Sequence, residues 1–334
     1  MTRAAEKSAH THTSGYDLIG DIHGHADELK RLLSELGYQK RGGAWRHASR
    51  RAVFLGDLID RGPQQREVIN VVRSMVEGDA ALICMGNHEL NAIGYATASS
   101  DESGEYLRRH SAKNYLQHDA FLSEFLPHSM GYREVIQWFC QIPLWLELET
   151  STGARARVIH ACWDNGVIER VKPYLQRSAD GSWILGERFD HRLYQHDTEI
   201  FRDVELLLKG PEVRLPRGQS FRDKSGIERF NARVQWWSPA QTWAEAAILG
   251  GGQMRDFDMN TPISSELLKS TYQEEIPVFV GHYWMSGDLS RLTERVACLD
   301  WSVAKGGRLV AYRWDGEQKI DNDKFVSVWS RYSA

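Results

Sequence analysis

Three short stretches of this chain carry carboxylate, imidazole and amide side chains at close spacing. Their polar residues are Asp21 and His23, then Asp57, Asp60 and Arg61, then Asn87 and His88. Mixed nitrogen and oxygen donors of this kind suit Mn²⁺, Fe or Zn²⁺, whereas Mg²⁺ and Ca²⁺ prefer shells of oxygen alone. One such stretch is usually a polar loop. Three in succession predict a metal site.

An apolar run typical of a buried strand precedes each of the three stretches. These runs cover 16–19, 52–55 and 81–85. Between them, 25–36 and 65–77 have apolar residues at helical spacing, and a glycine follows each. Strand–helix–strand units of this kind form parallel strands with right-handed crossovers. The polar stretches should therefore meet beyond the carboxyl ends of the strands.

Two further histidines end strand-like runs later in the chain. His160 follows 156–159, which we expect to form a hairpin with 144–149. His282 follows the buried run 277–280 in the same way. Both histidines are therefore candidates for the same metal site.

The remaining segments are less informative. Residues 90–139 are mainly helical in pattern, and 164–275 contain a helical stretch at 191–209 and an expected helix at 239–249. We interpret 164–275 as an insertion that caps one side of the site. The alternative is a surface elaboration that adds only stability.

One domain over 15–334, with that insertion, is the preferred organisation because no internal repeat or Pro/Ser-rich linker divides it. Residues 1–14 are polar and lack an apolar core, so we expect a disordered tail and no secretory signal. Three strand-like runs close the chain: 295–300, 308–313 and 325–329.

Composition limits the partners and the compartment. A net charge of −4 offers no general basic surface for nucleic acid, and no apolar run approaches the ~20 residues of a membrane span. The four cysteines form no Cys-x-x-Cys pair, so we expect buried free thiols in a reducing compartment. The cytoplasm is the default location.

The order of these motifs resembles that of the calcineurin-like metallophosphoesterases. Gly-Asp-x-x-Asp-Arg-Gly and Gly-Asn-His-Glu are most similar to the phosphoprotein phosphatase branch, which includes bacterial serine/threonine protein phosphatases, and bacterial diadenosine tetraphosphatases share the closing hairpin. The resemblance runs from Tyr16 to about Arg313, with 164–275 aligning only loosely. It implies an α/β fold, a four-layer sandwich of two mixed β-sheets flanked by helices, with an inserted cap segment.

The resemblance also implies a ligand set for two divalent metal ions. The first ion would take Asp21, His23 and Asp57, and the second would take Asp57, Asn87, His160 and His282. Mn²⁺ is the preferred ion, with Fe and Zn²⁺ as alternatives. Two such ions about 3.5 to 4 Å apart clamp a phosphoryl oxygen and activate a bridging water as hydroxide, so no protein nucleophile is needed.

Three residues beside these ligands are candidates for catalysis. His88 follows a ligand directly and would project beside the metals as the general acid that protonates the leaving oxygen. Asp60 would pair with His88 and fix its ring. Arg61 offers a planar fork for phosphate oxygens. The alternatives are a core histidine for His88 and a structural ion pair for Arg61.

The chain departs from the family pattern at two places. Met85 stands where many eukaryotic-type members have Arg, and Tyr283-Trp284 stand where many bacterial members have Thr-Pro. A second substrate-binding cation is therefore either missing or supplied from elsewhere. Arg233 is the candidate, and a surface arginine is the alternative.

The resemblance implies a phosphoester hydrolase with a phosphorylated substrate as its partner. We expect a phosphatase that acts on proteins or on phosphomonoesters in general. The main alternative is symmetrical cleavage of diadenosine tetraphosphate, with Trp163, Trp237 or Trp284 stacking on adenine. A non-catalytic metal-binding scaffold is an alternative from another class, and repair of RNA ends is a minor one. The sequence does not indicate an oligomeric state.

Overall fold

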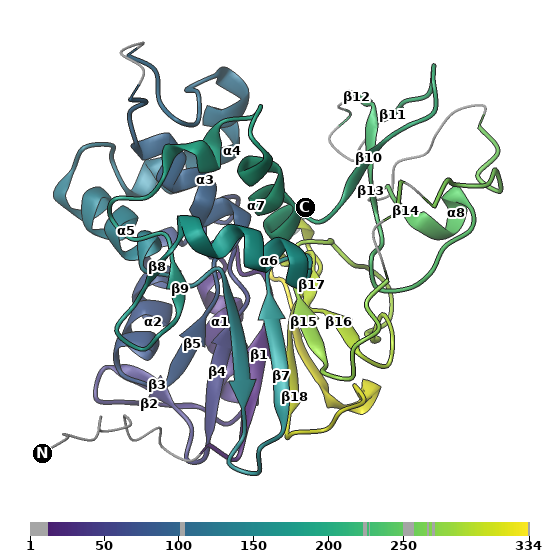
Figure 1. The fold of residues 1–334 in the computed structure, drawn as a ribbon. Helices are drawn as coiled ribbons and strands as arrows, with labels where there is room; N and C mark the ends of the chain where they lie inside the picture. The colour runs from purple at the N-terminus through teal and green to yellow at the C-terminus, as the bar shows by residue number, and fades with distance from the viewer. Residues whose placement is uncertain are drawn as a thin grey trace, which may run out of the picture.

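The strands that precede the three polar stretches pair side by side in one β-sheet (Figure 1). They are β1 (Gly15–Ile19), β4 (Arg50–Phe54) and β5 (Ala81–Ile83), and both pairings are parallel, as predicted. The computed structural model describes residues 13–100, 104–222, 226, 228–249, 257–265, 267–268 and 271–332. Most of the tail expected over 1–14 therefore lies outside the described residues.

Two helices connect these strands, as the helical spacing predicted. α1 (Ala26–Glu35) lies between β1 and β4, and α2 (Gln65–Glu77) lies between β4 and β5. Their apolar side chains recur every three or four residues, so they share one face of each helix and are buried there. A small hairpin of β2 (Gln39–Arg41) and β3 (Ala44–Arg46) follows α1.

Three antiparallel strands extend the first sheet. β18 (Arg308–Trp314) pairs with β1, and both β17 (Asp300–Trp301) and β19 (Phe325–Trp329) pair with β18. The single strand predicted over 295–300 is wrong, because the chain changes sheets within it. β16 (Val296–Cys298) belongs to the second sheet, and β17 belongs to the first.

The second sheet is also mixed and has the order β16-β15-β7-β6. β15 (Val278–Val280) runs parallel to β16 and to β7 (Arg155–Ile159), and β6 (Trp145–Glu149) is antiparallel to β7. The predicted hairpin before His160 is thus confirmed. The strands that lead to His160 and His282 lie next to each other.

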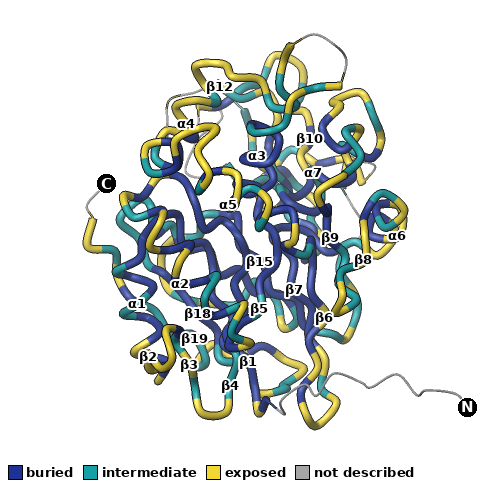
Figure 2. Tube along the Cα trace, turned by 90° about the vertical axis from the view of Figure 1, so that its left-hand side faces the viewer, coloured by how far each residue is buried: buried dark blue, intermediate teal, exposed yellow. Residues whose placement is uncertain are grey.

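The two sheets pack face to face on a shared apolar layer. Leu18 and Val53 of the first sheet and Val158 and Phe279 of the second belong to this layer and are fully buried. Because side chains alternate along a strand, the residues next to them point to the outer faces and pack against helices. Figure 2 shows the buried strands at the centre. The architecture is a four-layer α/β sandwich, as expected.

Three helices follow β5, in agreement with the helical pattern of 90–139. They are α3 (Asn87–Ala96), α4 (Ala112–Glu124) and α5 (Met130–Cys140). The hydroxyl of Ser111 accepts the N–H of Asn114 at the start of α4, and the hydroxyl of Ser129 accepts the N–H of Tyr132 at the start of α5.

The segment 164–275 begins with helices that pack on the second sheet. They are α6 (Asn165–Val171) and α7 (Glu199–Lys209), with the strand pair β8 (Gln176–Arg177) and β9 (Trp183–Ile184) between them. The helical stretch predicted over 191–209 is a 3₁₀ turn (His191–Tyr194) followed by α7. The other 3₁₀ turns are Lys172–Tyr174, Val303–Lys305 and Asn322–Lys324.

A small lobe follows α7 and stands apart from the four layers in Figure 1. Its elements are β10 (Glu212–Arg214), β11 (Phe221–Arg222), β12 (Glu228–Arg229), β13 (Asn231–Val234), α8 (Trp243–Ala246) and β14 (Ala247–Ile248). The sheet β10-β13-β14 has its own apolar core, which includes Val213, Val234 and Trp243. Within the described ranges, every helix of the protein is too short or too polar to cross a bilayer.

The helix predicted over 239–249 is wrong beyond one turn. Thr242 accepts the N–H of Glu245 and begins α8, which ends after four residues at Ala246. The next two residues form β14 and pair with β13. Strand pairing inside the lobe therefore overrides the helical spacing of this stretch.

Candidate active site

The loops that follow β4 and β5 approach each other very closely. Glycine is required at Gly86, because a Cβ atom there would overlap the backbone nitrogen of Asp57. The buried carboxylate of Glu89 accepts the N–H groups of Asp57 and Leu58, both at 2.8 Å, and that of Gly86 at 3.0 Å. One acidic side chain therefore holds both loops in place.

Five of the residues predicted to form the site have a left-handed backbone conformation. They are His23, Asp57, Asp60, Arg61 and His282, with φ values from 46° to 71°. Such conformations are strained for residues with a side chain, and they persist only where the surroundings hold them. Their concentration here is typical of a functional site.

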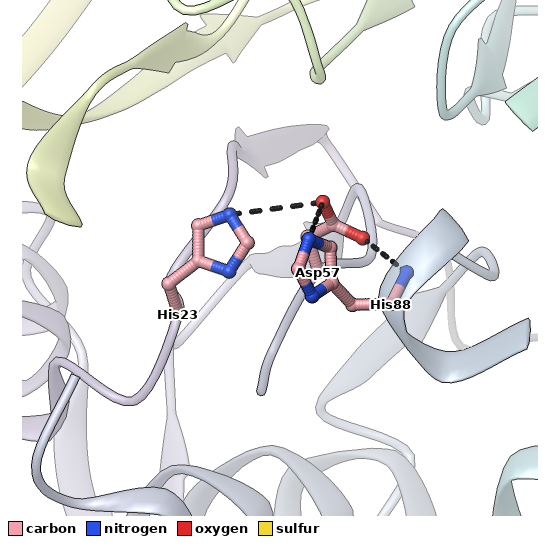
Figure 3. A group of neighbouring side chains, drawn as sticks. All are labelled: His23, Asp57 and His88. Carbon is pink, nitrogen blue, oxygen red and sulfur yellow. Dashed lines mark hydrogen bonds and ion pairs between the residues drawn. The ribbon is translucent and has the colours of Figure 1, made fainter. Parts of the chain in front are cut away.

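His23 and His88 point toward the carboxylate of Asp57 (Figure 3). His23 Nε2 lies 3.7 Å and His88 Nε2 lies 3.9 Å from Asp57 Oδ2. His23 Nδ1 lies 2.8 Å from the carbonyl oxygen of Ile59, which can only accept, so Nδ1 carries the proton and Nε2 presents a lone pair. The ligand atoms of these three side chains are close enough to share one metal ion.

Asp57 also belongs to a second group of ligand atoms, together with His160 and His282. His160 Nε2 lies 3.3 Å from Asp57 Oδ2 and 3.2 Å from Asn87 Oδ1. The rings of His160 and His282 meet edge to face, with centroids 5.2 Å apart. Asp57 is the residue that both groups share, which is the arrangement that a bridging ligand requires.

The donor atoms of these groups fit metal ions. Nε2 of His23 and Nε2 of His282 are buried and have no hydrogen-bond partner among the described residues. Burial lowers the pKa of both imidazoles well below the usual range, so both rings are neutral. Neutral imidazole nitrogens that are buried without a hydrogen bond are suited to bind a cation.

His160 gives the clearest sign that the site needs positive charge. Its Nδ1 donates to the carbonyl oxygen of Leu55 at 2.7 Å, so its Nε2 faces the oxygens of Asp57 and Asn87. Burial lowers the pKa of His160, but the charges of Asp57 and Asp21 outweigh burial and raise it to about 10. A cation at Nε2, either a proton or a metal ion, satisfies all these acceptors.

Asp21 lies beside the second group but is not a member of either group. Its carboxylate oxygens accept the backbone N–H of His282 at 3.1 and 3.3 Å. Burial and the neighbouring carboxylate of Asp300 raise the pKa of Asp21 well above its usual range. Its role as a direct ligand stays a prediction.

His88, a member of the first ligand group, also forms a chain of contacts with Asp60 and Arg61. His88 Nδ1 lies 2.5 Å from Asp60 Oδ2, and His88 Nε2 lies 3.3 Å from Arg61 Nη2. Because a carboxylate can only accept, His88 Nδ1 donates to Asp60, and His88 Nε2 accepts from Arg61. The Arg61 side chain is exposed, so its other N–H groups can reach a substrate.

A second imidazole, which no sequence motif indicates, contacts Asp60. His118 of α4 has its Nδ1 2.7 Å from Asp60 Oδ1, and the residue is buried. The two residues lie 58 positions apart. No motif or spacing in α4 marks this histidine, so tertiary packing alone brings it to the site.

Trp284 contacts two cations that sequence analysis did not connect. Arg61 Cζ lies 4.1 Å and Lys305 Nζ lies 4.0 Å from the centroid of its ring. The backbone N–H of Trp284 donates to the buried carboxylate of Asp300 at 2.9 Å. Trp284 therefore joins Arg61 to the turn between β17 and β18, where Lys305 lies.

Arg233 lies on β13 of the small lobe. Its Nε is 3.7 Å from Glu212 Oε1. Burial is the main cause that lowers the pKa of His282, and the positive charge of Arg233 is the second. The charge of Lys209 acts in the same direction. Arg233 therefore stands near the second ligand group, and its contact with a substrate stays a prediction.

Three comparisons relate the chain to known proteins. A family profile described as calcineurin-like phosphoesterase matches residues 16–283. The asymmetrical bis(5'-nucleosyl)-tetraphosphatase PrpE of Halalkalibacterium halodurans is 46% identical over 74 residues, which are 22% of this chain and 30% of that protein. The symmetrical bis(5'-nucleosyl)-tetraphosphatase of Vibrio vulnificus is 24% identical over 315 residues, 90% of this chain and 95% of that protein. A protein serine/threonine phosphatase structure from Saccharomyces cerevisiae has a TM-score of 0.46 at 13% identity, over 98% of this chain and 82% of that one.

Proposed function

Because the chain belongs to the calcineurin-like phosphoesterase family, we propose that it releases phosphate from phosphorylated proteins or from phosphomonoesters in general. Metal-dependent hydrolysis of phosphoesters follows from the family, and the substrate class is our proposal. The proposed release of phosphate is supported above all by His88, whose Nε2 lies 3.9 Å from Asp57 Oδ2 and 3.3 Å from Arg61 Nη2. A proton donor, the shared candidate ligand and a phosphate-binding cation therefore meet in one small space.

We propose that two divalent ions complete this site. Asp21, His23 and Asp57 would hold the first, and Asp57, Asn87, His160 and His282 would hold the second. Imidazole, amide and carboxylate donors together favour Mn²⁺, and Fe and Zn²⁺ are the other ions that suit them. When bound, the two ions would offset negative charge on the phosphoryl group and lower the pKa of a water, so that the water can lose a proton and attack phosphorus.

His88 would give the leaving oxygen its proton. Its Nδ1 is committed to Asp60, so only Nε2 is available, and Nε2 faces the ligand groups. Arg61 donates to this Nε2 in the structure. Once Nε2 carries a proton, it can no longer accept, and the guanidinium is free to bind phosphoryl oxygens. Substrate binding would therefore change the partner of Arg61.

The tryptophans near the site favour a phosphomonoester over a substrate whose bases must stack. Trp163 and Trp237 are only 5% and 7% exposed. The ring of Trp284 is engaged with Arg61 and Lys305. An adenine would have to displace packing contacts at each of these rings before it could stack.

Cleavage of diadenosine tetraphosphate is the second candidate. It is favoured by the relative from Vibrio vulnificus, which matches over nearly the full length of both chains. Symmetrical cleavage of this substrate yields two ADP, and asymmetrical cleavage yields ATP and AMP. The alternative of a non-catalytic metal-binding scaffold is not retained, because the family is one of phosphoesterases.

One competition experiment separates the two candidates. The protein is loaded with Mn²⁺ and offered a phosphoserine peptide and diadenosine tetraphosphate at equal concentration, and the products are separated by ion-exchange chromatography. Faster release of phosphate from the peptide supports the phosphatase. Faster formation of ADP, or of ATP and AMP, overturns it in favour of the nucleotide hydrolase. An Asp57→Asn preparation purified in parallel measures any contaminating phosphatase.

The segment 164–275 would cap the site from the side of the second ligand group. This is supported by Arg233 and Lys209, because both belong to this segment and the charges of both act on His282. The small lobe that carries Arg233 has its own core, so it can present this side chain without disturbing the sandwich. Phosphorylated proteins would then meet the lobe as well as the metal site.

A cytoplasmic location is also part of the proposal. It is supported by Cys84, Cys140 and Cys298, which are buried and free. Unpaired thiols suit a reducing compartment.

A further inference from the structure

Two imidazoles hold the carboxylate of Asp60, and the family motifs account for only one of them. Oδ2 accepts from His88 Nδ1 at 2.5 Å, and Oδ1 accepts from His118 Nδ1 at 2.7 Å. His88 stands at the start of α3 and His118 in the middle of α4. Asp60 therefore links the proposed proton donor to α4.

The pocket around His118 is aromatic, and Asp60 is the polar group that its ring contacts. The ring stacks on Phe121, with centroids 4.8 Å apart, and is tilted against Tyr95 at 5.3 Å. Its Nε2 is buried and has no hydrogen-bond partner in the part of the chain that the structure describes. Leaving a buried polar atom unpaired costs about 1–3 kcal/mol. An apolar residue would avoid that cost in this aromatic pocket, so the contact with Asp60 is what favours a histidine.

Asp60 depends on this contact because of its place in the loop. Its φ is 70° and that of Arg61 is 71°, so the backbone is strained, and Gln65 holds the N–H of Asp60 at 2.8 Å. Burial raises the pKa of Asp60, but His118 and His88 outweigh burial and hold it well below the usual range. A carboxylate held at one oxygen can turn about its Cβ–Cγ bond. Held at both, it keeps Oδ2 directed at His88.

We propose that His118 is a positioning residue for the proton transfer from His88. By binding Oδ1 of Asp60, it keeps Oδ2 on His88 Nδ1 and so keeps His88 Nε2 turned toward the leaving oxygen. In the reaction, the bond from phosphorus to the leaving oxygen breaks, its electron pair stays on that oxygen, and the oxygen takes the proton of Nε2. Water forms the new bond to phosphorus and releases a proton to solvent. The inference rests on the proposed function, because only a leaving oxygen that needs a proton gives His118 this role.

Three substitutions separate the hydrogen bond of His118 from its bulk. In His118→Asn, the amide nitrogen is as many bonds from Cβ as Nδ1 is, so it can donate to Asp60. In His118→Leu, an apolar side chain fills the aromatic pocket and donates nothing. In His118→Gln, the amide nitrogen stands one bond farther out, in the place of Nε2. His118→Asn is the matched control for the other two.

The first readout is the dependence of rate on the leaving group. Mn²⁺-loaded protein is assayed on a phosphoserine peptide, whose alkoxide needs a proton, and on p-nitrophenyl phosphate, whose phenolate does not. His118→Leu and His118→Gln should lower kcat on the peptide by about 10- to 100-fold, with KM unchanged and with little effect on the aryl ester. His118→Asn should stay close to the parent on both substrates.

The outcomes distinguish this inference from the proposed function. Equal losses on both esters in His118→Leu, or no loss on the peptide, would overturn the positioning role. A parent protein that hydrolyses neither ester would instead contradict the proposed function. If His118→Leu does not fold, the comparison of His118→Asn with His118→Gln decides, because both keep an amide in the pocket.

Proton NMR gives a second readout that does not depend on turnover. Imidazole N–H protons bound to a carboxylate resonate downfield of the backbone amides, and ¹⁵N labelling of histidine identifies them. The parent should show such a signal from both His88 and His118. His118→Asn should lose only the signal of His118, and His118→Leu should also shift or broaden that of His88. An unchanged His88 signal in His118→Leu would overturn the inference.

Discussion

The carboxylate of Glu89 accepts the backbone N–H of Asp57 at 2.8 Å, although the two residues lie 32 positions apart. The same carboxylate accepts the N–H groups of Leu58 and Gly86. A buried acid that holds three donors fixes the loop on which the shared candidate ligand stands. The precision of the proposed metal site therefore depends on a residue outside the proposed ligand set.

Glu89→Gln is expected to weaken the fold and the metal site together. Glutamine has one carboxamide oxygen in place of two carboxylate oxygens, so at least one of the three N–H groups loses its acceptor. A buried group left unpaired costs about 1–3 kcal/mol. Urea denaturation should show this loss in the free energy of unfolding, and metal analysis should show weaker retention of Mn²⁺. An unchanged unfolding curve would contradict the clamping role of Glu89.

Asp57→Asn is expected to lose both metal ions and turnover together, because Asp57 belongs to both groups of ligand atoms. Metal content is measured by plasma mass spectrometry and turnover on p-nitrophenyl phosphate. Asp17→Asn is the control, since Asp17 is equally buried but pairs with Arg50 within the sheet. That variant should lose stability and keep its metals. Two bound ions and normal turnover in Asp57→Asn would remove the shared-ligand role.

His88→Asn is expected to keep the metals and slow hydrolysis of the phosphoserine peptide by about 10² to 10⁴. The asparagine amide can still donate to Asp60, but the side chain offers no proton to a leaving oxygen. The loss should be much smaller on p-nitrophenyl phosphate. The same loss on both esters would show that His88 is not the proton donor.

The parts of the site that could be predicted are those determined by residues close together in the sequence. β1, β4 and β5 are short apolar runs, and each ends in a polar motif at fixed spacing. Parallel pairing of these strands then places Asp57 and His88 at one edge of the sheet. The chain itself therefore encoded that the candidate site residues after these strands lie together.

Other contacts to the site have no local cause. His118 reaches Asp60 from α4, and Lys305 reaches Trp284 from a turn between two strands, and neither residue belongs to a motif. The helix predicted over 239–249 failed for a related reason, because the pairing of β14 with β13 is set by residues earlier in the chain. Tertiary packing determines these two contacts and the end of that helix, and the spacing of neighbouring residues in the sequence does not indicate tertiary packing.

Arg233→Gln is expected to raise KM for the phosphoserine peptide about 10-fold, because a hydrogen bond to a charged group would be lost. The control is Glu212→Gln, which removes the carboxylate that Arg233 contacts and keeps the arginine. If Arg233 binds phosphate, Glu212→Gln should leave KM unchanged or lower it. If Arg233 serves only its ion pair with Glu212, the two variants should behave alike.

Trp284→Leu is expected to lower kcat/KM by about 2- to 30-fold, because each cation–π contact contributes about 0.5–2 kcal/mol and the one to Arg61 would be lost. Trp284→Phe keeps a ring and should lose less. The loss should be equal on the phosphoserine peptide and on diadenosine tetraphosphate. A loss confined to the nucleotide would show that Trp284 stacks on adenine instead.

A double-mutant cycle tests whether Trp284 acts through Arg61. If Arg61 binds phosphate as proposed, Arg61→Gln alone should lower kcat/KM on the peptide, because the phosphate would lose a bidentate cation. If the ring of Trp284 serves to hold that guanidinium, Trp284→Leu should have little further effect in the Arg61→Gln background. Losses that simply add would mean that the two side chains act independently, and the contact at 4.1 Å would then be packing without a part in catalysis.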